Sequence, residues 1–152
     1  MNIVDLIKEQ HREFEGLMDQ VARTSDDDPE GRLRSFVYTR SRLHAHGRAE
    51  ERILFPRMKE DPPTRSAALE ALEWHHASSD LVKEFKQVSP QSELWLPKWL
   101  VIRGIILAHI EVEEEQALEL IQLNFERQEL EQLGRDFQEA EENIIRQSTK
   151  AK

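Results

Sequence analysis

The sequence contains no cysteine, and this absence excludes several kinds of chemistry at once. It rules out a disulfide framework, a thiolate metal site and a cysteine nucleophile. Long apolar runs are also absent: the longest, "LVIRGIILAHI", is interrupted by Arg103 and His109 and is shorter than the roughly 20 residues that cross a bilayer. The first ten residues, "MNIVDLIKEQ", carry charges and lack the apolar core of a signal peptide. We therefore expect a cytoplasmic protein with no membrane partner.

Basic residues are fewer than acidic residues in this chain. The chain has 21 basic residues against 30 acidic ones, which gives a formal net charge of -9. Basic residues gather between Arg32 and Arg52, but Glu50 and Glu51 interrupt them. Because nucleic-acid binding needs a basic face, we expect no nucleic-acid partner.

Glycine and proline are scarce, at 5 and 6 residues, and four of the six prolines fall between long segments. The breaks are at 24–31, 60–64 and 88–92, with a weaker one at 122–126. The segments between them are too long for strands and suit helices. We predict an all-α protein: an up-down-up-down four-helix bundle with an additional C-terminal helix. Its 152 residues form a single domain over 1–152, with the bundle at about 2–124 and the last helix at about 126–147.

Each of the first four segments carries a histidine on its apolar helical stripe. At steps of three and four residues the stripes contain, in chain order, His11, His46, His75 and His109. Two of the stripes also carry a glutamate one turn later, Glu50 after His46 and Glu113 after His109. Residues four apart share a helical face, so each imidazole and carboxylate point into the bundle together.

Such a set is typical of a metal site, because a glutamate is rarely buried unless it is paired or binds a metal. Nitrogen and oxygen ligands together suit iron, manganese or zinc better than calcium or magnesium. Six ligands are too many for one tetrahedral zinc and fit two ions bridged by the carboxylates, with a solvent-derived oxo or hydroxo bridge offsetting further charge. The predicted ligands are His11, His46, Glu50, His75, His109 and Glu113.

Plainer interpretations exist for each piece. A single histidine on an apolar stripe is often a hydrogen-bonded core residue, and a single His-x-x-x-Glu is often a surface pair. The polar residues could also satisfy one another without metal, although burying them in that way is costly. The joint pattern over four helices favours the metal site.

Neighbouring residues compete for some of these roles. In "WHH", the apolar residues of the segment centre on His75, whereas His76 lies at the edge of the stripe. His44 lies on the opposite face from His46. Among the glutamates of "EVEEEQ", those at 111 and 115 belong to a solvated face.

Glu51 follows the predicted ligand Glu50, and Glu114 follows the predicted ligand Glu113. Each of the two lies one residue off the stripe. We interpret both as part of the solvated face, with a hydrogen bond to a ligand as the alternative role. Whether Glu114 or His76 binds the metal stays open.

Several stretches resemble the hemerythrin-like, or HHE cation-binding, domain family. "LHAHGRAEERILFP" is similar to the family's second-helix signature, "EWHHASSDLVKEF" to its third helix and "LAHIEVEEEQALEL" to its fourth. "LNFERQELEQLG" resembles the segment that follows the bundle in many members, so the likeness covers about residues 1–135. It implies a four-helix bundle with two non-haem iron ions, held by the same six residues that the stripes select.

The sequence departs from the oxygen-carrying hemerythrins in two places. Those proteins have a second histidine one turn after the third-helix one, where this chain has Ser79. Their fourth helix has an aspartate five residues after its histidine; here Glu113 stands at four and Glu114 at five. The missing nitrogen ligand argues against simple oxygen carriage and leaves one iron with an open or water-filled position.

The function expected from these residues is binding of, or reaction with, a small oxidant such as oxygen, peroxide or nitric oxide, in sensing, scavenging or iron handling. One alternative is a di-iron oxidase or peroxidase, with Trp95, Trp99 and Tyr38 carrying oxidising equivalents. Another is a metal-stabilised interaction module that docks through the last helix. We expect a monomer or a weak homo-oligomer.

Overall fold

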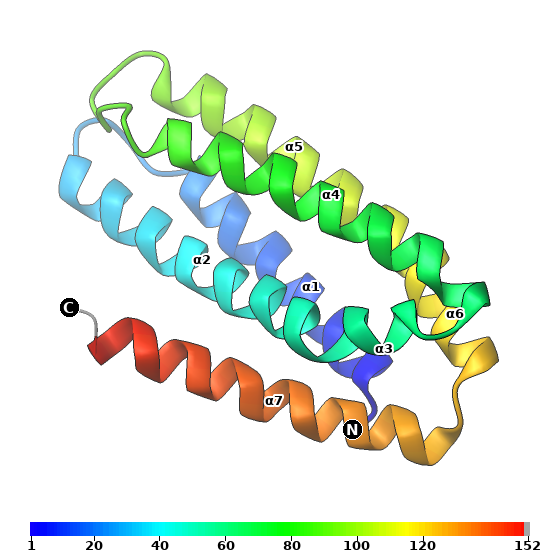
Figure 1. Cartoon of the computed structure of the whole chain (residues 1–152). Coiled ribbons are helices and arrows are strands. Elements are labelled where there is room, and N and C mark those ends of the chain that lie inside the picture. The colour runs from blue at the N-terminus through cyan, green and yellow to red at the C-terminus, as the bar shows by residue number, and fades with distance from the viewer. Residues whose placement is uncertain (151–152) are drawn as a thin grey trace.

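The computed structural model describes residues 1–150, which form long helices joined by short turns. In chain order the elements are α1 (Ile3–Ala22), α2 (Pro29–Ala49), η1 (Glu50–Leu54), α3 (Phe55–Lys59), α4 (Pro62–Phe85), α5 (Trp95–Val112), η2 (Glu113–Ala117), α6 (Leu118–Asn124) and α7 (Arg127–Lys150). The π-helical segments η1 and η2 continue the helices before and after them, so α2–η1–α3 and α5–η2–α6 are each one long helix. With α1 and α4 these make the four-helix bundle, and the predicted all-α class is confirmed (Figure 1).

Local sequence accounts for where several helices begin. The side chain of Asn2 accepts a hydrogen bond from the backbone N–H of Asp5 at 3.0 Å, which caps α1. Asp28 caps α2 in the same way through Gly31, with Pro29 in the first turn. Asp61 precedes α4 but makes no capping bond with its side chain, which pairs with Arg57 instead.

The core divides into two apolar clusters at opposite ends of the bundle. One gathers the start of α1, the end of α2 with α3, the start of α4, and α6 and α7. The other is aromatic and contains Phe14, Phe36, Phe85, Trp95 and Trp99. The stripe histidines and glutamates lie at the level between the two clusters, which shield that level from both ends.

The last helix, α7, packs along α1, α2 and η1 on one side of the bundle (Figure 1). Its apolar stripe, including Leu130, Leu133 and Phe137, is buried within the chain itself. Arg57 of α3 anchors its beginning through Glu129 at 2.6 Å. The surface expected for docking on a partner is therefore used to cover the chain's own bundle.

No helix within residues 1–150 is long and apolar enough to cross a membrane.

Gly134 marks the closest approach of α7 to the N-terminus. A Cβ at this position would overlap the carbonyl oxygen of Met1 and crowd the backbone nitrogen of Ile3. We expect Gly134→Ala to lower the free energy of unfolding by about 1–3 kcal/mol, because the clash outweighs the better helix propensity of alanine. Urea denaturation measures this.

Gly16→Ala is the matched control, since nothing lies within 4 Å of a Cβ built there. That variant should be more stable by up to about 1 kcal/mol. Equal stabilisation by both substitutions would show that α7 does not press on the N-terminus.

Candidate metal centre

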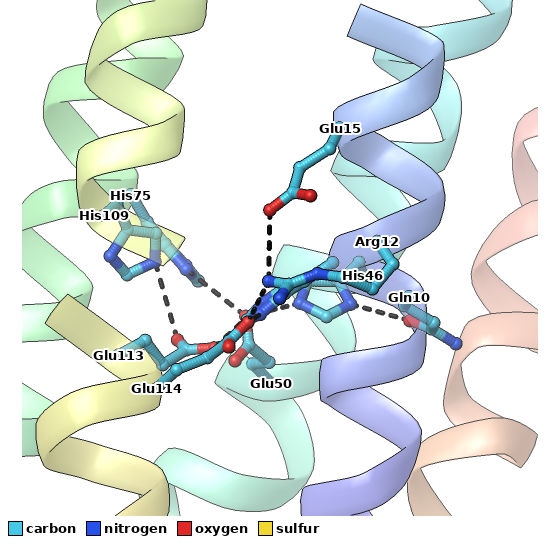
Figure 2. A network of polar contacts seen from close by, with 10 residues as sticks. Gln10, Arg12, Glu15, His46, Glu50, His75, His109, Glu113 and Glu114 are labelled. Atoms are coloured by element: carbon cyan, nitrogen blue, oxygen red, sulfur yellow. Dashed lines mark hydrogen bonds and ion pairs between the residues drawn. The ribbon is translucent and has the colours of Figure 1, made fainter. Parts of the chain in front are cut away.

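Six side chains from four helices meet in one layer across the middle of the bundle (Figure 2). They are the six ligands predicted from the sequence: His11, His46, Glu50, His75, His109 and Glu113. All are buried except His75, which is mostly so. Folding therefore brings together every side chain that the stripes had selected.

Glu50 lies between two imidazoles from different helices. Its Oε1 is 3.2 Å from Nε2 of His46 and 3.5 Å from Nε2 of His75. One oxygen of Glu50 thus faces a histidine of its own helix and a histidine of α4.

Glu113 occupies the equivalent position opposite. Its Oε1 is 3.2 Å from Nε2 of His11, and its Oε2 is 3.5 Å from Nε2 of His109. The donor atoms fall into two groups, each within 4.8 Å: His11, His46 and Glu113, and His75, His109 and Glu113. Glu113 belongs to both groups and Glu50 to neither, so the carboxylate of Glu113 lies within reach of both pairs of imidazoles.

The chemistry of the layer fits a cation. Both oxygens of Glu50, both oxygens of Glu113 and Nε2 of His46 are buried and have no hydrogen-bond partner among residues 1–150. They lie 3.2–3.5 Å from neighbouring polar atoms but lack hydrogen-bond geometry. Leaving such groups unsatisfied costs several kcal/mol, on the order of 1–3 each. Polar atoms that converge without bonding one another are what a metal site requires.

The pKa shifts of Glu50 and Glu113 also favour a bound cation. Burial, together with the charge of Glu50, raises the pKa of Glu113 well above its usual range. Burial also acts to raise the pKa of Glu50, but the charge and contacts of His46 and His75 hold it well below its usual range. The enclosed layer therefore resists two simultaneous negative charges, and a divalent cation would remove that conflict.

The imidazoles are also unequal. Burial lowers the pKa of His109 to about 4. Burial acts in the same direction on His75, but the contacts with Glu50 and Glu51 prevail and raise its pKa to about 10. His109 is therefore already in the neutral form that binds metals, whereas His75 must lose a proton to do so.

The glutamates that follow Glu50 and Glu113 hold two of the imidazoles from outside. Nδ1 of His75 donates to Glu51 at 2.9 Å, and Nδ1 of His11 donates to Glu114 at 2.7 Å. Arg12 in turn donates to Glu114 at 2.6 Å. These bonds keep a proton on Nδ1 and orient each ring so that Nε2 faces the layer. Of the two roles left open for these residues, the hydrogen bond to a histidine is the one the structure shows.

The hydrogen bonds that hold His46 in place were not predicted from the sequence. Nδ1 of His46 donates to the side-chain oxygen of Gln10 at 2.7 Å, and Gln10 donates to Glu141 of α7 at 2.7 Å. Glu141 falls on the apolar stripe of its helix, and that position was the available signal. His109 has no such bond: its Nδ1 has no partner, and its ring stacks on Trp74.

A change of helical pitch begins at each central glutamate. The N–H of Phe55 bonds to the carbonyl of Glu50, and that of Leu118 bonds to the carbonyl of Glu113, each five residues back. A π segment adds one residue to a turn, and such bulges often occur at functional sites. The extra residue re-registers the helix, so that apolar side chains return to the core below the polar layer.

Other predicted positions lie outside the layer. His76 has 66% of its side chain exposed, and His44 is exposed as well. Ser79, one turn after His75, is exposed and lines a cavity that leads to the layer. Trp95 and Trp99 are buried in the aromatic cluster.

Taken together, the fold and the site define a helical-bundle protein with a buried histidine and glutamate centre suited to cations. The family model "Hemerythrin HHE cation binding domain" matches residues 2–121, and the chain belongs to that family.

Two similar proteins are informative. A crystal structure of a hemerythrin HHE cation binding domain-containing protein, the Rv2633c homolog from Mycobacterium kansasii, superposes with a TM-score of 0.85 over 95% of this chain and 87% of that one. Its sequence identity is 19%, so it bears on the fold alone. A DNA nickase of Nostoc sp. (strain PCC 7120 / SAG 25.82 / UTEX 2576) is 25% identical over 147 residues. That match covers 95% of this chain, which spans 40% of the length of the relative.

The outer glutamates can be tested without metal. We expect Glu51→Ala and Glu114→Ala each to lower the free energy of unfolding of the metal-free protein by about 1–3 kcal/mol, because each leaves a mostly buried imidazole N–H without its acceptor. Denaturant titration measures the loss. Glu115→Ala, which removes an exposed carboxylate of the same helix, should change stability by less than about 0.5 kcal/mol. If Glu115→Ala lowered the free energy of unfolding by as much, the loss would come from the removal of a negative charge and not from these hydrogen bonds.

Proposed function

We propose that this protein is a non-haem di-iron protein that binds or reacts with a small oxidant, such as oxygen, peroxide or nitric oxide. The observation that carries the proposal is that four imidazoles and two glutamates converge in one layer, where both oxygens of each glutamate and Nε2 of His46 are buried without a hydrogen-bond partner among residues 1–150. Membership of a cation-binding family supports it. The donor set also admits manganese or zinc, and iron rests on the likeness to hemerythrins.

The six residues would divide into two histidine pairs with the carboxylates between them. His11 and His46 would hold one ion, and His75 and His109 the other, with Glu50 and Glu113 shared. When bound, a pair of iron ions supplies redox chemistry toward oxygen, peroxide or nitric oxide.

The chain's own residues would prepare the layer for this role. Glu51 and Glu114 hold His75 and His11 with Nε2 toward the centre. The apolar clusters above and below keep bulk water out along the bundle axis. Ser79 stands where oxygen carriers have a further histidine, so the His75 side would have one imidazole fewer than in those proteins, and the cavity that Ser79 lines would give an incoming ligand access to the layer.

The metal content is directly testable. Reconstitution with Fe(II) without air, followed by exposure to air, should give about two irons per chain and a near-ultraviolet absorption band of oxygen-bridged iron. Glu113→Ala should lose iron, because it removes the carboxylate common to both donor groups. Glu115→Ala should keep it. Fewer than about one iron per chain and no such band in the unaltered protein would refute the proposal.

Removal of the metal should also lower stability. Ions that bind only the folded chain stabilise it by mass action, by about 4 kcal/mol for a ligand at 1,000 times its Kd. Chelation should therefore reduce Tm measurably in circular dichroism melts. An unchanged Tm would favour a bundle whose polar groups satisfy one another without metal.

One observation favours a second candidate, an enzyme that uses the oxidant on another molecule. A cavity of about 520 Å³ reaches the layer from outside, far larger than a diatomic molecule needs. Sustained turnover of peroxide with an organic co-substrate would support the enzyme, whereas consumption that stops after one equivalent would support binding. We do not extend DNA nicking to this chain, which is acidic and matches only part of that relative.

A further inference from the structure

The large cavity lies between α2 and α4 and runs along the bundle away from the polar layer. At its inner end are the imidazoles of the layer and Glu50. From there it runs past Leu43 and Val82, which are half-buried, and its deep side is backed by the buried Phe14, Phe36, Trp99 and Ile106. It is thus a slot with a polar floor and an apolar wall, of a size typical of sites for small organic molecules, about 300–1,000 Å³.

The length of the slot follows from the positions of its lining residues. Phe36 precedes His46 by ten residues on α2, and Lys86 follows His75 by eleven on α4. At a rise of 1.5 Å per residue, both place the far end roughly 15 Å from the layer. Because the two helices run in opposite directions, both counts lead to the same end of the bundle.

The rim of the slot is basic, although the chain as a whole is acidic. Arg40, Lys83 and Lys86 line it, and none of them makes an ion pair within residues 1–150. Within the described part of the chain, the only carboxylates that line the slot are Glu50 and Glu51, at the layer end. The rim cations therefore lie at the outer part of an apolar slot without a partner from the described chain.

We propose that the slot binds an elongated amphiphilic anion of the medium-chain carboxylate class. The carboxylate would pair with Arg40, Lys83 and Lys86, and the alkyl chain would lie along the half-buried Leu43 and Val82 with its end toward the histidine layer. Apolar burial of the chain supplies affinity, and the basic rim selects the charge and the direction of entry. This goes beyond the proposed di-iron function and does not require a metal in the layer.

The test is a calorimetric titration of the full-length, metal-free protein with dodecanoate below its micelle concentration. We expect saturable binding with one site per chain. Octanoate should bind more weakly, because it buries less apolar surface. Dodecanol and dodecyltrimethylammonium should bind at least tenfold more weakly than dodecanoate.

Variants locate the site. Lys83→Glu/Lys86→Glu should weaken dodecanoate binding at least tenfold, while the control Lys98→Glu/Lys150→Glu, with the same charge change away from the slot, should not. Equal binding of anion and cation, or equal effects of the two variants, would overturn the proposal. Iron content measured on the same variants separates the slot proposal from the di-iron proposal. A variant that loses dodecanoate binding but retains iron concerns the slot alone.

A separate observation concerns α7, which lies beyond the residues that the family model matches. Gln10 accepts from His46 with its oxygen and donates to Glu141 with its nitrogen, and both bonds are 2.7 Å and buried (Figure 2 shows the first). Because Glu141 Oε1 accepts from the amide nitrogen of Gln10, the amide oxygen is the atom left to accept from the ring of His46. The second oxygen of Glu141 is buried without a partner.

We infer that Glu141 and Gln10 are positioning residues for His46: they hold its proton on Nδ1 and leave Nε2 free toward the layer. The contrast is His109, whose Nδ1 has no acceptor. The residue before His11 is Gln10. The residue before His75 is Trp74, and its ring stacks on His109 instead. Only one half of the layer is therefore oriented by the added helix.

Long-range ¹⁵N–¹H NMR of the metal-free protein reads the tautomer of His46 directly. The unaltered protein should show the Nδ1–H form, Glu141→Ala a mixture, and Glu141→Gln a mixture or partial recovery. Competition with a chelator should show metal affinity lowered about 10–100-fold in Glu141→Ala. Glu139→Ala, an exposed carboxylate of α7, is the control.

Gln10→Met tests the same link without altering α7 and should give the same tautomer change. A His46 ring that stays in the Nδ1–H form in both Glu141→Ala and Gln10→Met would overturn the inference. Because the NMR measurement uses no metal, its result stands apart from the di-iron proposal.

Discussion

Two carboxylates, Glu50 and Glu113, are enclosed at the centre of the bundle with no hydrogen-bond partner for any of their four oxygens. Buried charge on this scale is destabilising unless something compensates for it. Four imidazoles converge on the same layer, and apolar clusters close it from above and below. The buried carboxylates must be compensated, and three features are consistent with this requirement. They are the positions of the helices, the pitch change at each central glutamate and the outer hydrogen bonds.

The layer is organised as two similar halves. In each, two consecutive glutamates begin a π segment; the first faces the centre, and the second accepts from a histidine of a neighbouring helix. The halves differ in what lies outside them. α7 covers the His46 side and supplies Glu141, whereas the side between α2 and α4 opens into the slot. The slot is nevertheless lined by all four imidazoles, His11 and His46 as well as His75 and His109.

Much of the site could be predicted because helical spacing is local. Histidines on four apolar stripes, and glutamates one turn after two of them, must face inward if the stripes pack together, whatever the exact packing. The same reasoning separated His75 from His76 and assigned the glutamates at 111 and 115 to solvent, and both placements agree with the exposure of these residues. The residues one step off a stripe were harder, because their contacts depend on the neighbouring helix.

The sequence by itself determined the helices, their inward faces and the six donors, since each depends only on residues within a few turns of one another. The tertiary structure decided the rest. That Glu114 meets His11 from 103 residues away, that Gln10 links His46 to Glu141, and that α2 and α4 stand apart enough to leave a slot all depend on how separate helices approach. Helix approach is fixed by side-chain packing over the whole core, and spacing along one helix carries no information about it.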